Sequence, residues 1–280
     1  MDEEVDDMHG RVVDAHPLSP SLVRVVLEGG DLASLEMPDA TDAYINVAFR
    51  PAGATYDEVF DPQAVRDHHP KDHQPARRRY TVRSWDPVAA RLTVDFVVHG
   101  DSGVAGPWAA AARPGDVLVF TGPSGSYRPD PQADWHLMVG DESALPAIAA
   151  SLDALPAGTR AVVRVVCDGP DHEIELASTA DVDLVWLHRH GDARDESLLV
   201  AAVEVLDFTA LGSGAGTPFG FVHGEADEIR AVRRHLLEER GLTRQQLSCS
   251  PYWRRTMTDE AWRRIKRDYV AAMEADAVAS

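Results

Sequence analysis

The sequence has little cysteine: Cys167 and Cys249 are the only two among 280 residues. Two cysteines make neither a disulfide framework nor a zinc site, so we expect no structural metal. Long apolar runs are also missing, since none approaches the roughly 18 residues that a membrane-spanning helix needs. The first ten residues, MDEEVDDMHG, lack the apolar core of a signal peptide. These absences predict a cytoplasmic protein without membrane insertion.

Positive charge is scarce as well. Lys and Arg number 27 against 46 Asp and Glu, which gives a formal net charge of −19. Such a surface repels phosphate backbones, so we expect no nucleic-acid partner, and an anionic ligand would need a local basic pocket. The apolar share of 44% is typical of a globular chain, and the length favours two domains.

The first half of the sequence predicts short strands and no long helix. In residues 43–49 the side chains of Ile45, Val47 and Phe49 alternate with those of Tyr44 and Asn46. Six such segments between turn residues favour a small antiparallel barrel. The predicted strands are residues 11–13, 22–27, 43–49, 79–83, 91–98 and 116–120. Residues 51–76 interrupt them with a polar, His-rich segment, interpreted as a loop, for which a metal site is the less favoured alternative.

The second half alternates between strands and helices, which predicts a parallel sheet. The predicted strands are residues 135–139, 161–167, 183–187 and 219–223, and the predicted helices are residues 143–155, 197–205, 226–240 and 258–275. A Pro- and Asp-rich link near residues 128–133 marks the boundary. We therefore expect a barrel domain over residues 1–130 and an α/β domain over residues 131–280.

One motif with chemical meaning is Arg79-Tyr80-Thr81-Val82-Arg83. A flavin site needs an aromatic face for the ring, a hydrogen-bond donor and a cation for the diphosphate. Side chains alternate along a strand, so Arg79 and Thr81 share one face and Tyr80 points to the other, unless the strand twists sharply. The alternative is an edge strand with a solvated Arg–Tyr pair.

A second motif covers residues 99–110, HGDSGVAGPWAA. Gly106 suits a helix cap and Pro107 the first position of a short helix. Free amides at a helix start bind phosphate, and glycines allow a ligand to approach the backbone closely. An ordinary strand–turn–helix connection is the alternative.

Together these motifs resemble the siderophore-interacting protein family, the flavin-dependent ferric-siderophore reductase branch of the ferredoxin-reductase-like proteins. The resemblance continues in order through residues 122–127, 140–148, 224–234 and 252–255. It implies an N-terminal six-stranded antiparallel β barrel that binds FAD, followed by a parallel-sheet α/β domain of the nicotinamide-dinucleotide type.

The resemblance also implies residue roles. Arg79 would face the FAD diphosphate, Tyr80 would stack on the isoalloxazine, and Thr81 would bond near its N5. Glu225 would lie on the cleft-facing edge of the last sheet strand. The other implied cofactor-binding residues are Val82, His99, Gly100, Ala105, Gly106, Trp108, Ala109, Asp141, Glu142, Ser143 and Ala144.

The implied substrate pocket departs from the family at one position. Family members often carry a lysine on the third strand, where this sequence has Asn46, and Arg50 is the nearby cation that could replace it. The remaining implied substrate-binding residues are Arg128, Arg254 and Arg255. For each, an ordinary surface arginine is the alternative.

The implied function is flavin-dependent reduction of ferric siderophores. FAD would take electrons from NADH or NADPH, or from a ferredoxin-type carrier, and pass them singly to Fe(III), with no side chain acting as acid or base. Two alternatives remain open. One is a general NAD(P)H flavin reductase or diaphorase, and the other is a non-enzymatic siderophore-binding carrier.

Overall fold

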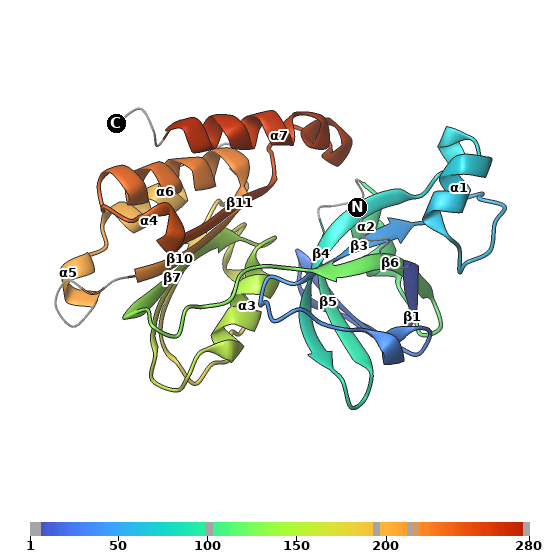
Figure 1. Ribbon diagram of the computed structural model, residues 1–280, viewed down its shortest axis with the longest axis horizontal. Helices are drawn as coiled ribbons and strands as arrows, with labels where there is room; N and C mark the ends of the chain where they lie inside the picture. Colours follow the sequence, from blue (N-terminus) through green and yellow to red (C-terminus); the bar gives the residue numbers. More distant parts are fainter. Residues whose placement is uncertain (1–6, 99–102, 193–196, 212–215, 217, 277–280) are drawn as a thin grey trace. The chain divides into compact units, whose positions relative to one another are not determined.

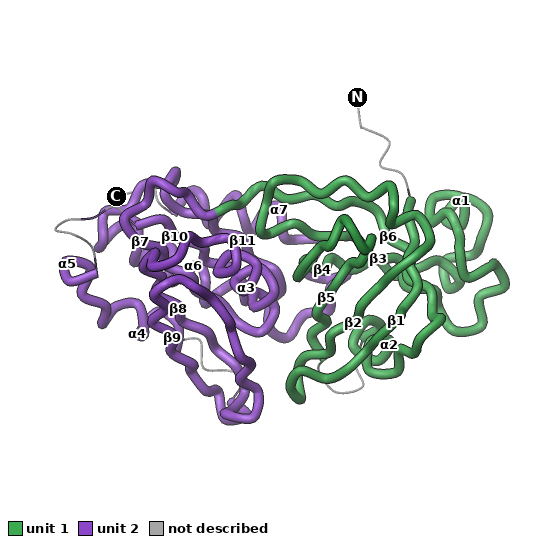
Figure 2. Tube along the Cα trace, turned by 90° about the horizontal axis from the view of Figure 1, so that it is seen from below, with its two compact units in different colours: residues 1–128 green, residues 129–280 purple. Residues whose placement is uncertain are grey.

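The computed structural model describes residues 7–98, 103–192, 197–211, 216 and 218–276. The chain forms two compact units, residues 1–128 and residues 129–280 (Figures 1 and 2). The division lies two residues before the one expected from the sequence.

The first unit is a closed antiparallel barrel of six strands in the order β1-β2-β5-β4-β3-β6, which confirms the predicted architecture (Figure 1). Its strands are β1 (Asp7–Ser19), β2 (Leu22–Glu28), β3 (Tyr44–Phe49), β4 (Ala76–Asp86), β5 (Arg91–Val97) and β6 (Val117–Ser124). Its helical elements are η1 (Leu32–Ser34), α1 (Pro62–His68), η2 (Lys71–His73) and α2 (Ala105–Ala111).

The alternation in β3 fills the barrel. Ile45 and Val47 are fully buried and Phe49 is 5% exposed, and all three belong to the apolar core. Tyr44 and Asn46 lie on the opposite face of the strand, where they are half-buried. One side of the β3–β4 pair therefore packs the core, and the other is left for polar side chains.

The segment between β3 and β4 is not only a loop, as the sequence had suggested. It contains helix α1, whose start is capped by Asp61: the carboxylate accepts from the amides of Gln63 at 2.6 Å and Ala64 at 3.0 Å. Pro62 suits the first helical position because it has no amide to leave unbonded.

The second unit is a parallel sheet in the order β11-β10-β7-β8-β9. Its strands are β7 (Trp135–Asp141), β8 (Arg160–Cys167), β9 (Asp181–His188), β10 (Pro218–Glu225) and β11 (Leu247–Trp253). Its helical elements are α3 (Leu145–Ala154), η3 (Pro170–His172), α4 (Leu198–Glu204), α5 (Phe208–Leu211), α6 (Ala226–Glu238), η4 (Arg244–Gln246) and α7 (Asp259–Asp276).

The strand order reverses between β7 and β10. From β7 the chain moves outward to β8 and β9, then returns to β10 and moves the other way to β11. Right-handed crossovers therefore place α3 and α6 on opposite faces of the sheet. Helices α4 and α6 share one apolar core with β7 and β8. Ligands of such sheets bind beyond the carboxyl ends of the strands, at this reversal.

Strand β11 is absent from the sequence-based prediction. It pairs in parallel with β10 and forms the edge of the sheet. We had expected the strand with Glu225 to be the last strand of the sheet, but β11 follows it. The two glycines at the end of β7 and β10 allow close contact: a Cβ on Gly140 would lie 2.5 Å from the His223 carbonyl oxygen, and one on Gly224 2.8 Å from Asp141 Oδ2.

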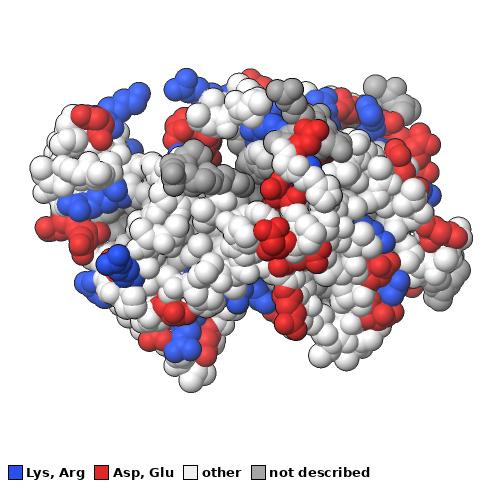
Figure 3. All heavy atoms as spheres, turned by 180° about the vertical axis from the view of Figure 1, so that it is seen from behind, with Lys and Arg blue, Asp and Glu red and all other residues white. Residues whose placement is uncertain are grey.

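Charged side chains of both signs are spread over the face drawn in Figure 3. Among the described residues, no helix is long and apolar enough to cross a membrane.

Candidate functional site

The outer face of the β3–β4 pair carries the first motif. Arg79 lies opposite Asn46 and Thr81 opposite Tyr44 in the antiparallel register. Arg79 is exposed, and its guanidinium carbon lies 5.2 Å from the centre of the Tyr44 ring. No carboxylate in the described part of the chain forms an ion pair with Arg79. Its charge is therefore available to an anionic ligand.

Asn46 adds an unsatisfied acceptor to this face. Its Oδ1 atom is buried and has no hydrogen-bond partner among the described residues. Asn46 lies between Arg79 on β4 and Thr121 on β6. A buried acceptor without a donor costs about 1–3 kcal/mol, so a ligand with hydroxyl or N–H groups would stabilise this position. A flavin dinucleotide offers such donors beside an anionic diphosphate, and the outer face fits it.

Tyr80 and Val82 point to the other face, as the alternation predicts. The Tyr80 ring is half-buried, 4.3 Å from the Phe96 ring centre and 6.5 Å from that of Phe49. Val82 is 4% exposed and belongs to the barrel core. Any contact of Tyr80 with a flavin ring would therefore use the part of the ring that this aromatic cluster leaves open.

The second motif folds differently from the prediction at the start of its helix. Helix α2 begins at Ala105, so Gly106 lies in its first turn and is not the cap. Ala105 and Ala109 are buried in the barrel core, and only their backbone could face a cofactor. Trp108 is half-buried and packs 5.7 Å from Phe49. The predicted ligands His99 and Gly100 lie outside the described residues.

In the second unit Asp141 joins three elements at the carboxyl edge of the sheet. It is 1% exposed. Its Oδ1 accepts from the Ser143 amide, and its Oδ2 from the Glu225 amide and the Trp253 indole, each at 2.8 Å. The acceptor positions of this carboxylate are taken up by the chain itself. Asp141 was predicted as a cofactor ligand. Its hydrogen bonds instead hold the strand ends together, so it does not bind a nucleotide directly.

Glu142 is likewise engaged within the protein. It is buried, and both of its carboxylate oxygens accept from Nη2 of Arg189, the residue after β9, whose side chain is 10% exposed. Burial alone would lower the pKa of Arg189, but the hydrogen bonds and charge of Glu142 outweigh it and raise that pKa. Ala144 is also fully buried, so the turn after β7 packs into the interior of the second unit.

Arg255 is not the exposed cation that the sequence suggested. Its side chain is 9% exposed and pairs with Glu225 at 3.2 Å and with Glu228, both fully buried. Glu225 also caps α6 by accepting from the amides of Asp227 and Glu228. Burial raises the pKa of Glu225, and the Arg255 amide and charge oppose that rise. This network holds β10, β11 and α6 together.

The other predicted substrate arginines also have partners. Arg254 lies 3.2 Å from Asp227 and over the Tyr269 ring, while the exposed Arg128 lies 2.5 Å from Asp39. Arg50 donates to the carbonyls of Ala54 and Tyr56 within its own loop. These bonds hold the Arg50 guanidinium against its own loop.

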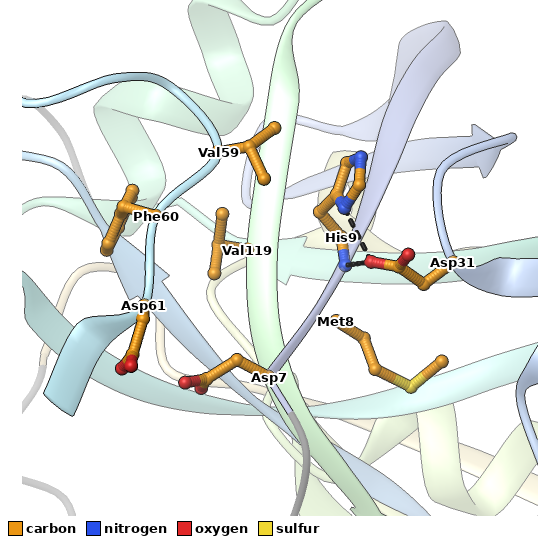
Figure 4. A pocket seen from close by; sticks show the side chains of 8 residues that line it. All are labelled: Asp7, Met8, His9, Asp31, Val59, Phe60, Asp61 and Val119. Carbon is orange, nitrogen blue, oxygen red and sulfur yellow. Dashed lines mark hydrogen bonds and ion pairs between the residues drawn. The ribbon is translucent and has the colours of Figure 1, made fainter. Parts of the chain in front are cut away.

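A hollow of 240 Å³ in the first unit was not predicted (Figure 4). Val59, Phe60 and Val119 form its apolar side, and the carboxyl groups of Asp7 and Asp61 face each other. His9 Nδ1 lies 2.6 Å from Asp31 on its far side. The acids come from segments far apart in the sequence, which is why no motif points to them.

Two family models match the chain and divide it as the fold does. The siderophore-interacting FAD-binding domain matches residues 11–127, and the siderophore-interacting protein model matches residues 133–256. The first range contains the barrel with Arg79, and the second the parallel sheet. The chain belongs to the siderophore-interacting protein family. This confirms the resemblance seen in the sequence.

Two curated relatives align over nearly the whole chain. One is uncharacterized protein Rv2895c of Mycobacterium tuberculosis, 39% identical, with 93% of this chain and 95% of the relative covered. The other is ferric vibriobactin reductase ViuB of Vibrio cholerae, 32% identical, with 94% of this chain and 96% of the relative covered. Both alignments therefore extend across the two units of this chain.

Solved structures agree on the fold. The siderophore-interacting protein SipS from Aeromonas hydrophila superposes with a TM-score of 0.79 at 26% identity, covering 95% of this chain and 99% of SipS. The ferredoxin reductase of carbazole 1,9a-dioxygenase gives a TM-score of 0.61 at 15% identity, covering 89% of this chain and 68% of the reductase. The ferredoxin-reductase-like fold expected from the sequence is confirmed.

Proposed function

We propose that this protein is an FAD-dependent oxidoreductase that reduces ferric siderophores and releases ferrous iron. The observation that carries the proposal is the outer face of β3–β4. There the exposed Arg79 lies beside Asn46, and within the described part of the chain neither a carboxylate pairs with Arg79 nor a donor bonds to Asn46 Oδ1. The match to a siderophore-interacting FAD-binding domain and the 32% identity to a ferric vibriobactin reductase support it.

Each residue of this face would bind a different part of FAD. Arg79 would hold the diphosphate through charge-assisted hydrogen bonds. Asn46 and Thr81 would accept from or donate to polar atoms of the flavin half, and Tyr80 would cover part of the ring. Bound FAD supplies the exchange between two-electron donors and one-electron acceptors.

Iron is the substrate and not a resident cofactor. A siderophore holds Fe(III) through hard anionic oxygens, which bind Fe(II) more weakly, so one-electron reduction releases the metal. With NADH as donor the overall change balances as NADH + 2 Fe(III) → NAD⁺ + 2 Fe(II) + H⁺. The protein has to bind and orient FAD and the ferric siderophore, and no side chain has to move a proton at the iron.

The second unit supplies the site proposed for the electron donor. Its parallel sheet reverses order between β7 and β10, where dinucleotides bind in such sheets. We propose NADH or NADPH as the donor on this basis, and a cytoplasmic location because that donor is a cytoplasmic metabolite. A ferredoxin-type carrier remains the alternative source of electrons. Arg128 is the remaining exposed candidate for binding the ferric siderophore, because the side chain of Arg255 is buried.

The test begins with the absorbance spectrum of the purified full chain. A flavin spectrum is expected, and acid precipitation should release the chromophore, since FAD would be held without a covalent bond. A protein that is colourless and takes up no added FAD contradicts the proposal.

The second stage follows reduction without oxygen. NADH, NADPH and dithionite are each added, followed by a ferric siderophore and a ferrous chelator. We expect chelated Fe(II) at a rate well above that with free flavin or ferricyanide as acceptor. Preference for free flavin would instead identify a general flavin reductase. A colourless protein that binds the ferric siderophore would identify a carrier.

A further inference from the structure

Positive charge is concentrated in two short stretches of this acidic chain. Residues 77–83 and residues 261–267 each hold four Lys or Arg and no acid, whereas the whole chain has 27 Lys and Arg against 46 Asp and Glu. The first stretch belongs to β4 and its flavin face. The second, AWRRIKR, lies in the first half of α7, and the proposed function has no use for it.

The arginines of α7 lie on its outer side. Trp262 and Tyr269 are buried and belong to a small core that α7 shares with the start of α6 (Figure 1). Arg263, Arg264 and Arg267 are spaced so that they share the opposite side of the helix, and all three are exposed. Three cations therefore face solvent within about one turn.

Carboxylates of the protein neutralise these arginines only weakly. Arg267 is 94% exposed, and its neighbour Asp268, 3.4 Å away, is itself 79% exposed. Arg263 is 43% exposed and pairs with Asp259 one turn earlier, at 2.8 Å. Within the described part of the chain no carboxylate pairs with Arg264. Exposed pairs of this kind contribute little and can be exchanged for a partner of opposite charge.

The arginines begin at the carboxyl edge of the parallel sheet. Strand β11 ends there at Trp253, and the indole of Trp262 donates to the Tyr252 carbonyl at 3.1 Å, which holds the first turns of α7 at this strand end. Arg263 and Arg264 follow Trp262 directly. Two of the three cations thus lie at the edge where the proposed function has its electron donor.

The chemistry of this surface favours an acidic protein that binds briefly. The outer side of residues 263–267 presents arginines and no apolar side chain, so charge and not apolar burial would hold a partner. Proteins that exchange electrons meet through small, weak interfaces, because the carrier has to leave after each transfer. Complementary charge speeds such encounters without making them tight.

We propose that Arg263, Arg264 and Arg267 form the docking surface for a small acidic one-electron carrier of the ferredoxin type. This rests on the proposed function and gives its carrier donor a place on the chain. Each reduced carrier gives up one electron and one Fe(III) takes it, so the overall change is carrier(reduced) + Fe(III) → carrier(oxidised) + Fe(II). No proton is exchanged.

The experiment uses a plant-type ferredoxin as the probe. It is reduced with dithionite, freed of excess reductant and mixed without oxygen with the oxidised, flavin-loaded full chain, and its reoxidation is followed by absorbance. We expect the second-order rate constant to fall as salt is raised. The double variant Arg264→Glu with Arg267→Glu should lower it at least about tenfold at low salt, because attraction becomes repulsion.

The matched control is the double variant Arg91→Glu with Arg113→Glu. Both arginines are exposed, and the net charge changes by the same amount. The rate constant should fall by less than about twofold. Calorimetry with oxidised ferredoxin should show weaker binding in the α7 variant alone. If that variant fails to fold, the single change Arg264→Ala takes its place, with an expected fall of severalfold.

Three results would overturn the inference: a rate constant unmoved by the α7 variant, an equal fall in the control, or no electron transfer from ferredoxin at all. Binding of α7 to vesicles of phosphatidylglycerol without binding of ferredoxin would instead assign the surface to a membrane.

Failure of the proposed function is recognised separately. Ferric siderophore reduction with NADH or dithionite, but none with ferredoxin, would leave that function standing and reject the docking surface. Conversely, ferredoxin binding that the α7 variant abolishes, in a protein that leaves the siderophore ferric even after reduction with dithionite, would keep the docking surface and reject ferric reduction.

Discussion

The indole nitrogen of Trp253 donates a 2.8 Å hydrogen bond to Asp141, a residue 112 positions earlier in the chain. Trp253 ends β11 and Asp141 ends β7, with β10 between them in the sheet. The same carboxylate oxygen accepts from the Glu225 amide at the end of β10. One buried acid therefore fixes three strand ends at the edge where the donor nucleotide is proposed to bind.

Asp141→Asn should destabilise the second unit. Four donors converge on the two oxygens: the Ser143 amide and hydroxyl, the Glu225 amide and the Trp253 indole. An asparagine replaces one acceptor by an NH₂ group that faces these donors. Losing hydrogen bonds to a charged group should lower the free energy of unfolding by about 2–3 kcal/mol, measured by urea denaturation.

Asp171→Asn is the control, because that side chain is 75% exposed. It should change the unfolding free energy by less than about 0.5 kcal/mol. If Asp141→Asn leaves stability intact and weakens only nucleotide binding, Asp141 is a cofactor ligand after all, as the sequence suggested.

Arg79→Ala tests the flavin face. A charge-assisted bond to a diphosphate is worth about 1.5–3 kcal/mol, or roughly tenfold to two-hundredfold in FAD affinity. The variant should fold normally but lose its flavin on dilution, measured by fluorescence of released FAD. Arg91→Ala, on the same barrel, removes an exposed arginine paired with Glu28 and should keep its flavin. Full flavin occupancy in Arg79→Ala at low micromolar protein would show that Arg79 does not touch the cofactor.

Most of the barrel could be predicted from the sequence because the side-chain alternation that specifies its strands is local. In β3 the alternation of Ile45 and Val47 with Tyr44 and Asn46 settles which face is buried. The same alternation in β4 places Arg79 and Thr81 on the outer face. The pairing of β3 with β4 then brings Asn46 beside Arg79, a neighbour that alternation alone does not name.

Strand β11 escaped prediction for a physical reason. Its sequence LSCSPYW contains two serines and a proline and has no run of β-branched residues, so nothing local favours a strand. Proline is tolerated because β11 is the edge strand and pairs only with β10. The burial of Arg255 was missed for a related reason, since its partners Glu225 and Glu228 lie about thirty residues earlier and meet it only through this strand.

Glu142→Ala should be one of the most damaging substitutions in the second unit. It leaves the Arg189 guanidinium buried without its carboxylate. Breaking a buried pair in this way costs about 3–5 kcal/mol of unfolding free energy, because one charge stays desolvated. The double variant Glu142→Leu with Arg189→Met removes both charges and should recover much of the loss. Equal destabilisation by the single and double variants would show that packing and not charge is responsible.

The hollow in the barrel predicts a pH dependence of stability. Burial and the nearby Asp61 raise the pKa of Asp7 above its usual value, against the opposing charge of Arg77. The folded state therefore favours protonated Asp7, and this contribution is lost as pH rises through the raised pKa. Asp7→Asn keeps the neutral form, so at pH 7 it should raise the urea midpoint above that of the unaltered chain.

The advantage of Asp7→Asn should vanish as the pH falls toward 3, where Asp7 itself is protonated. Asp61 behaves in the opposite sense, since the α1 amides of Ala64 and Gln63 lower its pKa. Asp61→Asn should therefore bring no gain at pH 7. A pH-independent effect of Asp7→Asn would mean that Asp7 does not titrate within the hollow.

Arg128 provides a test on the substrate side. The chain carries a net charge of −19, which slows the approach of an anionic ferric complex. Arg128 is half-exposed, and its pair with Asp39, itself 84% exposed, is weak enough to exchange for a ligand. Arg128→Ala should raise KM for an anionic ferric tricatecholate severalfold, by about 1 kcal/mol or less, and the effect should shrink with salt.

A neutral ferric trihydroxamate should respond less to Arg128→Ala, because the lost interaction acts on charge. Arg113→Ala is the matched control: it removes another exposed arginine from the same unit and changes the net charge equally. Its KM for the tricatecholate should stay close to that of the unaltered protein. If Arg113→Ala raises KM as much, the effect comes from the overall field of the protein. If both siderophores are affected alike and flavin content falls with them, Arg128 is structural and its assignment to the substrate is wrong.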